Sequence, residues 1–492
     1  MKPNSADNPN FTTASLPAIF LAVLIIWGLI LRPLLLEQTA IPLELIFIWA
    51  ASFSIGQLFL LGFSWNEIQS AVINRLAKAL PAIFILLLIG PLVAAWMISG
   101  TIPMLVSWGI EFINPRYLYL FCFLLSAIFS TLTGTSWGST ATIGVVMISI
   151  ASSLGENTAI AAGAIIGGAY FGDKLSPLSD TTNITAIATG VNIFTHIKAM
   201  LWTTVPSAII AVTAYTLVGT ETDFGYSAES SSDLMAFQTS LSEYFDYNLY
   251  LLLPILIVLL GSLKRWPIVP LILLSTFIAT ALAALIQDFS FSAVVNSLVY
   301  GISLEQHNDL SATDPVRLLL ERGGLYSMKE AVTIALLVFI FIGAIDLLNT
   351  MPRIVERLFS FTKGPKTTIL ASLFASAFTN AMTSNQSATA FIVGDAFYRR
   401  YDNLNVPRKV LSRSIEDTGT MIESIIPWHA TALFMVATLG VPVQEYWPWQ
   451  FLTLANLFIA PLITILGIGS VSYTHLRAHE TVLDLVCRLL LE

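Results

Sequence analysis

Oxygen-bearing side chains are concentrated in one stretch of the chain, Phe171–Asn183, which reads FGDKLSPLSDTTN. Two carboxylates, Asp173 and Asp180, flank Pro177, which predicts a break in a helix. Hydroxyl and amide side chains surround this break: Ser176, Ser179, Thr181, Thr182 and Asn183. Hard oxygen donors on unwound backbone suit Na⁺, and a carboxylate in a low-dielectric site can hold a proton when no cation is present. An aspartate that binds either Na⁺ or H⁺, never both, is the core of an exchanger.

The same stretch contains a basic residue, Lys174, directly after Asp173. The structural alternative is that the two pair only to stabilise the break. Ionisable residues inside a membrane are more often functional than structural. We therefore expect Lys174 to be the counter-ion of Asp173 within a cation- and proton-binding site.

The rest of the chain is strongly apolar, with 55% hydrophobic and 11% charged residues among 492 and a mean hydropathy of +0.77. Apolar runs of about 20 residues are long enough to cross a bilayer. This predicts an all-α polytopic membrane protein. The first run follows a polar start and lacks a cleavage site, so it is no signal peptide. The runs are Leu16–Leu36, Leu43–Phe63, Pro81–Ile98, His196–Val218, Tyr247–Leu263, Trp266–Ile286, Met328–Leu348 and Trp449–Gly467.

An internal repeat appears at an offset of about 250 residues, where FSTLTGTSWGSTAT aligns with FTNAMTSNQSATAF and Pro177 with Pro427. The repeat units are 81–218 and 328–467. Each unit reads as a helix, a long apolar hairpin with a polar tip, a broken helix and a final helix. The hairpins (117–153 and 367–399) precede the broken helices (158–190 and 409–440). Each hairpin is too long for one crossing, so we expect both to be re-entrant and to line a protein cavity.

The distribution of basic residues indicates the orientation. With about ten crossings and two re-entrant hairpins, most lysines and arginines fall on the side of the N-terminus. This predicts a cytoplasmic N-terminus in the cytoplasmic membrane. Residues 1–80 supply two crossings, and 219–327 supply an external acidic loop, two linking helices and a polar external segment. An odd number of crossings separates the repeats, so they are inverted, which is typical of secondary transporters with a site near the midplane.

The second repeat and the hairpin tips add further candidate ligands. Asp417 and Glu423 are expected to lie deep, whereas Glu416 is expected to form an interfacial ion pair with Arg413, and His429 to be a hydrogen-bonded packing residue. For any single hydroxyl, bonding back to the helix is the simpler explanation. As clusters, the tips could complete a cation shell with Thr135 and Ser136, then Asn380, Ser384 and Asn385.

One alternative is catalytic, because GTSWG at Gly134–Gly138 matches the G-x-S-x-G nucleophile pattern. In the second repeat Asn385 takes the place of this tip serine, and symmetry explains both tips whereas catalysis explains only one. We therefore do not expect an enzyme. Cys122 and Cys487 form no disulfide framework or transition-metal pattern, and no basic stripe suggests nucleic acid.

The stretch FGDKLSPLSDTTN, with GTSWGS and EDTGTMIESIIPWHA, resembles the NhaC family of Na⁺/H⁺ antiporters over residues 16–467. The resemblance implies exchange of Na⁺ or Li⁺ for H⁺ without a cofactor. It also implies that Asp173, Ser176, Asp180, Thr181 and Asn183 are ion-site residues. Some relatives look like exchangers of organic acids, such as malate for lactate, or of amino acids, so a small organic anion stays an alternative substrate.

The partners expected from the sequence are the lipid bilayer, the transported ions and a second copy in a homodimer. Residues 470–492 are polar, unrelated to the preceding helix and outside the resemblance. We expect them to be an artefact of sequence assembly without a functional role. An ordinary cytoplasmic amphipathic tail is the alternative.

Overall fold

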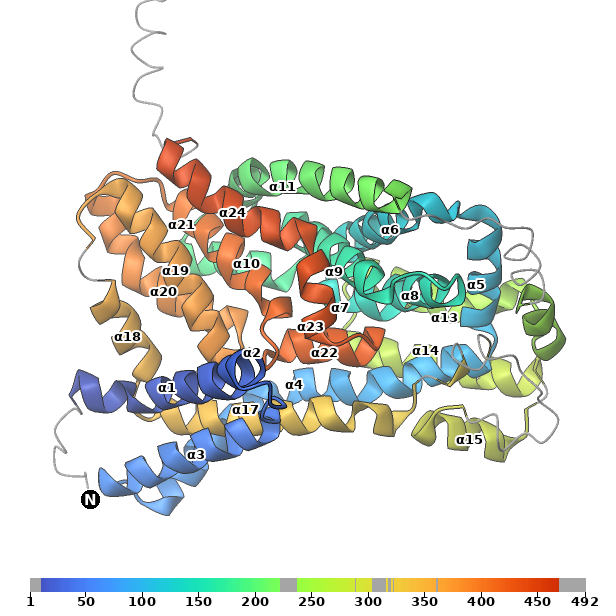
Figure 1. Ribbon diagram of the computed structural model, residues 1–492, viewed down its shortest axis with the longest axis horizontal. Coiled ribbons are helices and arrows are strands. Elements are labelled where there is room, and N and C mark those ends of the chain that lie inside the picture. The colour runs from blue at the N-terminus through green and yellow to red at the C-terminus, as the bar shows by residue number, and fades with distance from the viewer. Residues whose placement is uncertain are drawn as a thin grey trace, which may run out of the picture.

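The computed structural model describes residues 10–221, 237–287, 289–302, 316, 320–321, 323–359 and 362–468. Within these ranges every regular element is a helix (Figure 1). Seven helices are long and apolar enough to cross a membrane, and up to ten if each bent helix pair is one span. This confirms the all-α polytopic class. The tail 470–492 and most of the predicted acidic loop lie outside the described residues.

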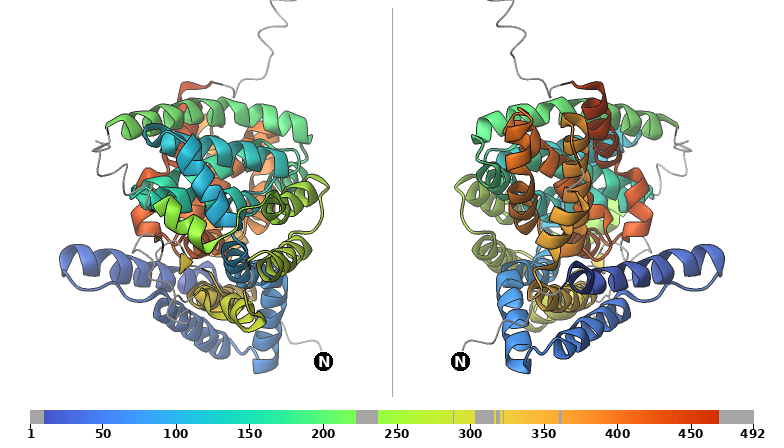
Figure 2. Two further views of the ribbon diagram at one scale, coloured as in Figure 1. Left: turned by 90° about the vertical axis from the view of Figure 1, so that its right-hand side faces the viewer. Right: turned by 90° about the vertical axis from the view of Figure 1, so that its left-hand side faces the viewer.

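The first helices pack on a pair of long central helices. The first span contains α1 (Phe11–Ile25) and α2 (Arg32–Leu35), and α3 (Leu43–Leu60) packs on α17 (Lys329–Asp346). The next helix, α4 (Trp65–Ile98), begins with a capping box at Ser64 and packs against both α17 and α14 (Ile268–Leu285). Figure 2 shows α1 and α3, in blue, projecting to one side of the bundle.

The first hairpin contains α6 (Leu118–Thr133), α7 (Ser136–Ser139), a π-turn at Thr140–Gly144 and α8 (Val145–Ser153). The second contains α19 (Pro365–Thr383) and α20 (Gln386–Asn403). Each turns through a left-handed residue, Gly134 with φ +70° or Ser384 with φ +47°. The next residue then caps the return helix, with Thr135 accepting from the Gly138 N–H and Asn385 from the Ala388 N–H. The two tips therefore use the same backbone geometry 250 residues apart. Thr135 is thus the equivalent of Asn385, and the predicted equivalence of Ser136 with Asn385 is wrong by one residue.

The two broken helices also correspond. The first consists of α9 (Thr158–Leu175) and α10 (Asp180–Thr189). The second runs through α21 (Arg408–Ser414), a π-turn at Ile415–Thr420 and a short 3-10 turn at Glu423–Ile425 to α22 (Ala430–Leu439). Both end at left-handed glycines, Gly190 with φ +66° and Gly440 with φ +72°. The breaks lie where the sequence places them, while the opposite membrane orientation of the repeats stays a prediction.

The remaining helices complete the two units and connect them. They are α5 (Thr101–Phe112), α11 (Ile193–Glu221), α13 (Leu253–Leu263), α15 (Phe291–Tyr300), α18 (Thr350–Leu358), α23 (Val443–Tyr446) and α24 (Phe451–Leu466). In Figure 1, α11 and α24 cover the face opposite to α4 and α17. The site elements therefore lie between two layers of long helices.

Close packing fixes the end of α9 beside the first hairpin. A Cβ on Gly168 would come within 2.1 Å of the Phe123 carbonyl oxygen, and one on Gly172 within 2.4 Å of the Thr131 nitrogen. Only glycine at these positions lets α9 lie so close to α6. The backbone contact holds Asp173, the residue after Gly172, next to the hairpin.

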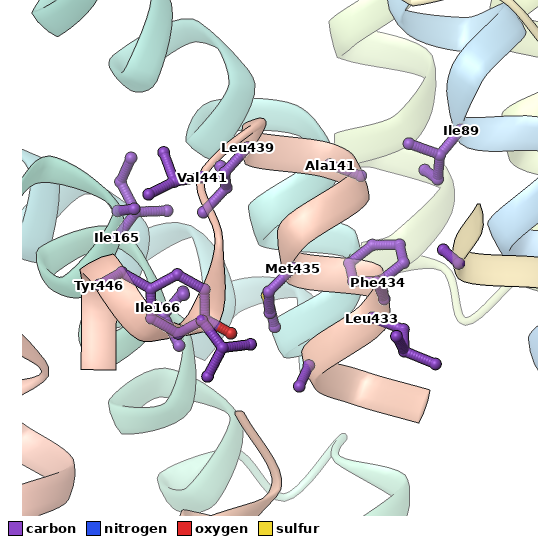
Figure 3. Packing of buried hydrophobic residues seen from close by; sticks show 14 of the residues in the cluster. Ile89, Ala141, Ile165, Ile166, Leu433, Phe434, Met435, Leu439, Val441 and Tyr446 are labelled. Carbon is purple, nitrogen blue, oxygen red and sulfur yellow. The ribbon is translucent and has the colours of Figure 1, made fainter. Parts of the chain in front are cut away.

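The two units interlock through their hairpins. The second half of each broken helix packs on the other unit's hairpin, with α22 against α7 and α8, and α10 against α20. At the first contact the rings of Trp137 and Phe434 stack with centroids 4.3 Å apart. Figure 3 shows Phe434 and Leu433 of α22 in this apolar region with Ala141 and Ile89. The contact between α22 and the first hairpin is therefore closed by apolar side chains.

Candidate functional site

A cavity of about 840 Å³ lies among the two breaks, the first hairpin tip and the loop between α13 and α14. From the first repeat, Asp173 and Asp180 line it. From the second repeat, Thr420, Glu423 and Ser387 line it. The structure thus brings predicted site residues from both units to one cavity. The predicted residues in its wall are Thr135, Ser136, Asp173, Asp180, Thr181, Asn183 and Glu423.

Asp173 lies at the end of α9 with only 6% of its surface exposed. Its carboxylate has the hydroxyls of Ser136 and Ser179 and the backbone N–H of Ser136 as neighbours. The Thr182 hydroxyl donates to the Asp173 and Lys174 backbone carbonyls at 3.4 and 3.3 Å, where α9 ends. Carboxylate, hydroxyl and carbonyl oxygens thus converge at this break.

The other predicted residues of the first break divide into two groups. Ser176 donates to the Thr131 carbonyl at 2.9 Å, and the Asn183 amide donates to the Pro177 and Ser179 carbonyls, so both hold the break in shape. Asp180 instead begins α10 as an exposed residue of the cavity wall, with Thr181 beside it. Ser176 and Asn183 therefore stabilise the break, whereas Asp180 and Thr181 present oxygen atoms to the cavity.

Glu423 is the equivalent carboxylate of the second break and is also 6% exposed. The Asn380 amide donates to its Oε1 at 3.1 Å and the Thr431 hydroxyl to its Oε2 at 2.9 Å. Tyr170 donates from 3.4 Å. The His429 ring bonds Asn380 at 3.1 Å and accepts from the Thr431 N–H, so it is the hydrogen-bonded residue that the sequence predicts.

The predicted partner of Lys174 is wrong. Its ammonium lies 2.5 Å from the Asp417 carboxylate, with both side chains buried, and also donates to Asn456 at 3.3 Å. Thr203 donates to the same Asp417 oxygen at 2.7 Å. Lys174 is thus a counter-ion across the two repeats, rather than to Asp173. Asp417, predicted as a cation ligand, is already neutralised by lysine.

The expected role of Glu416 is also wrong, because its side chain is fully buried rather than interfacial. It accepts hydrogen bonds from Thr185 at 2.7 Å and from Thr420 at 2.5 Å. Arg413 lies 3.7 Å from Asp417 instead, one helical turn on. Burial of Glu416 depends on how α10 packs over the second break, which no local pattern reveals.

The tip of the second hairpin contributes mainly structure. The Ser384 hydroxyl accepts from the Ala430 N–H at 2.8 Å, and Asn385 caps α20. Asn380 alone among the three predicted residues of this tip bonds a carboxylate. Sequence reasoning missed six polar residues that bond the buried acids. Two of them, Tyr170 and Thr431, donate to Glu423. The other four are Thr185, Thr203, Thr420 and Asn456, of which Asn456 had a signal as an isolated amide in an apolar helix.

The buried charges do not balance. The buried ionisable side chains of the described ranges include four carboxylates, Asp173, Glu416, Asp417 and Glu423, but only one lysine and one arginine, Lys174 and Arg413. The buried histidines, His196 and His429, carry a charge only when protonated. Both Lys174 and Arg413 lie against Asp417. If all four acids ionised, the interior would carry excess negative charge, which is costly unless cations or protons compensate. The arrangement can therefore bind a small cation or protons.

Comparison with known proteins agrees with this chemistry. Residues 168–468 match the model of the "Na+/H+ antiporter family". The chain belongs to this family. An "uncharacterized Na(+)/H(+) antiporter" of Haemophilus influenzae is 38% identical over 429 residues, covering 87% of this chain and 92% of the relative.

Two further relatives of this antiporter-family chain are similar over nearly their whole length. The Na(+)/H(+) antiporter NhaC of Alkalihalophilus pseudofirmus is 33% identical and covers 93% of this chain and 96% of its own. A malate-2H(+)/Na(+)-lactate antiporter of Bacillus subtilis is 31% identical and covers 90% of this chain and 94% of its own. These matches identify a transporter family rather than a family of enzymes.

The G-x-S-x-G pattern forms the turn of the first hairpin and lacks the context of a catalytic nucleophile. Gly134 ends α6, and Ser136 begins the short helix α7 beside Asp173. His429 contacts Asn380 and Thr431. The strand–turn–helix context that such a motif needs is absent from this described, all-helical region.

Proposed function

We propose that the protein is a secondary active transporter that exchanges Na⁺ or Li⁺ for H⁺ across the cytoplasmic membrane by alternating access. The observation that carries this proposal is Asp173, a buried carboxylate in a cavity wall surrounded by neutral oxygen donors. Among the described residues, the buried lysine and arginine, Lys174 and Arg413, pair with Asp417 and not with Asp173. Charge balance then requires a cation or a proton at Asp173.

The ion site of this proposal is the cavity face of the first break. Asp173 and Asp180 supply charge, and Ser136, Ser179 and Thr181 supply neutral oxygens, with Ser179 and Thr181 hydroxyls 3.1 Å apart. Na⁺ favours such hard oxygen ligands. Because Na⁺ and H⁺ bind the same carboxylate oxygens, one ion displaces the other, and the displaced ion can leave on the opposite side of the membrane.

Alternating access is supported by an asymmetry between two equivalent contacts. Trp137 and Phe434 stack where the first hairpin meets α22. Their equivalents 250 residues away, Ser387 and Ile184, line the open cavity. Lys78 and Arg265, which the charge distribution assigns to the cytoplasm, line the same cavity. We infer an inward-open state in which the aromatic stack closes the outer path.

A second cavity lies where this proposal expects the outer end of the path that the Trp137–Phe434 stack closes. Its volume is about 690 Å³, and its wall includes Tyr326, Gly440 and Pro442. The predicted topology puts these three residues on the outer side, because the broken helix 409–440 starts on the cytoplasmic side and ends at Gly440. Its apolar residues include Val145 from the first hairpin and Leu433 beside Phe434. In the proposed cycle this cavity connects with the ion site when the stack opens.

The alternative substrate is a small organic acid coupled to Na⁺ or H⁺, as the name of the Bacillus subtilis relative states for that protein. The observation that favours it is the pair of cationic residues Lys78 and Arg265 in the cavity wall, which could attract a carboxylate. Lys174, a deeply buried cation, is instead held by Asp417. Cation–proton exchange therefore fits the buried site better.

Reconstitution in liposomes containing a pH dye separates these functions. Addition of NaCl or LiCl should dissipate a preformed pH gradient, whereas choline chloride should not. Malate or lactate should change neither the rate nor the extent of this dissipation of the pH gradient. If proton movement required malate or lactate and Na⁺ alone had no effect, the organic-acid function would replace the proposed one.

A further inference from the structure

Glu416 is a fully buried carboxylate that the ion site of the first break does not include. It lies in the π-turn Ile415–Thr420, where an extra residue per turn changes the direction of the side chains. Its Oε1 accepts from Thr185 on α10, and its Oε2 accepts from Thr420 in the same π-turn. Glu416 therefore accepts from one neutral hydroxyl of each repeat, and the bond from Thr185 joins the two repeats.

Among the described residues, no buried lysine or arginine is left to neutralise this carboxylate. The charged groups that face it from α9 are Lys174 and Asp173, and Glu423 lies further along its own segment. Lys174 is held by Asp417 at 2.5 Å, and Arg413 also lies against Asp417. Two hydroxyl donors replace only part of the lost hydration of an ionised carboxylate. A proton on Glu416 removes that penalty.

The surroundings of Glu416 can exchange such a proton with the cavity. Thr420 bonds Glu416 and also lines the cavity. A threonine hydroxyl both donates and accepts, so Thr420 can give its own proton to Glu416 while its oxygen accepts another proton from the cavity. The bonds to Thr185 and Thr420 also persist when Glu416 is protonated, because either hydroxyl can then act as the acceptor.

We propose that Glu416 is a proton-binding site distinct from the Na⁺ site at Asp173. It takes up a proton through Thr420 when Na⁺ leaves Asp173 and releases it when Na⁺ binds. The coupling is electrostatic, because Asp173 and Glu416 are like charges in a low-dielectric interior and cannot both stay ionised without a cation. This inference rests on the proposed exchange of Na⁺ for H⁺, and it adds the residue that carries a coupled proton.

The test compares purified wild-type protein with Glu416→Gln, which has nearly the same shape and can accept from Thr185 while donating to Thr420. In weakly buffered detergent solution, NaCl is added and proton release is followed with a pH dye, with choline chloride as the salt control. Glu416→Gln should release about one proton fewer per protein than wild type. In liposomes, exchange of radioactive sodium for sodium should continue, because that exchange needs no net proton transfer.

A matched control is Glu156→Gln, in which a carboxylate that accepts from Tyr119 at 2.8 Å is removed from a loop outside the site. It should release as many protons as wild type. Equal proton release by Glu416→Gln and wild type would overturn the inference. Loss of sodium-for-sodium exchange in Glu416→Gln would also overturn it, since Glu416 would then be a sodium ligand or structural. A wild-type protein that moves no Na⁺ would instead contradict the proposed function itself.

Discussion

Asp173 and Glu423 lie 250 residues apart at equivalent breaks of the two repeats, and both line the same cavity. Their surroundings differ. Glu423 accepts from Asn380, Thr431 and Tyr170. The neighbours of Asp173 are mostly serine hydroxyls. A hydroxyl can donate a hydrogen bond to the carboxylate, or it can rotate so that its oxygen coordinates a cation. The repeat thus provides two similar carboxylates, and local side chains make one of them the better cation site.

Lys174 and Asp417 should be energetically coupled. Lys174→Met or Asp417→Asn alone should destabilise the protein by about 3–5 kcal/mol, because each leaves a buried group without its partner. The double variant should lose less than the sum of the single losses. Thermal unfolding in detergent measures this. Arg408→Gln breaks an exposed ion pair with Asp402 at 2.5 Å and, as the control, should change the melting temperature little. Strictly additive losses would show that the buried pair is not coupled.

The stack of Trp137 and Phe434 should control access from the outer side. To test this, Cys122 and Cys487 are first replaced by alanine. A single cysteine is then introduced as Leu178→Cys in the cavity wall. Right-side-out vesicles are then treated with an impermeant thiol reagent. Labelling should be slow with Phe434 present and faster in a Phe434→Leu background, which keeps an apolar side chain but removes the stack. Equal rates in the two backgrounds would show that the stack is not the outer gate.

The two hairpins should open to opposite sides of the membrane. In the same cysteine-free background, Glu156→Cys follows the first hairpin and should react with an impermeant reagent added to intact cells. Lys366→Cys begins the second hairpin and should be protected until the membrane is permeabilised. Reaction of Lys366→Cys from outside, or protection of well-expressed Glu156→Cys, would contradict the inverted topology.

The sequence predicted the features that local chemistry determines. Apolar length predicted the spans, and Pro177 predicted the break between α9 and α10. The aligned tips predicted equivalent turns, which appear at Gly134 and Ser384, one residue away from the predicted register. Each of these depends on residues within a few positions of one another. The same local signals placed Asp173 and Glu423 at their breaks.

Sequence reasoning failed where tertiary packing decides. Lys174 follows Asp173 directly, but adjacent residues on a helix point about 100° apart. Its actual partner, Asp417, is 243 residues away. The burial of Glu416 likewise requires α10 to cover the second break, as its bond from Thr185 shows. A charge pattern within one helix could predict neither contact.

Asp180 should be needed for exchange as the second carboxylate of the ion site. Asp180→Asn keeps an oxygen ligand but removes a charge, so Na⁺-driven proton efflux should be lost while the protein stays folded in the membrane. Liposomes with a pH dye measure this, with thermal unfolding as the folding control. Wild-type exchange by Asp180→Asn would contradict this prediction. Asp173 would then be the one charged ligand of the first break.

The central claim is that Na⁺ and H⁺ compete for the carboxylate of Asp173. The most direct measurement is the initial rate of Na⁺-driven proton movement in liposomes as a function of Na⁺ concentration at several pH values. Acidification should raise the apparent KM for Na⁺ with little change in maximal rate, because protons occupy the same oxygens. Asp173→Asn should raise that KM about ten-fold or more, equivalent to a loss of at least 1.4 kcal/mol of binding. Normal Na⁺/H⁺ exchange by the double variant Asp173→Asn/Asp180→Asn would contradict the account and move the site to Glu423.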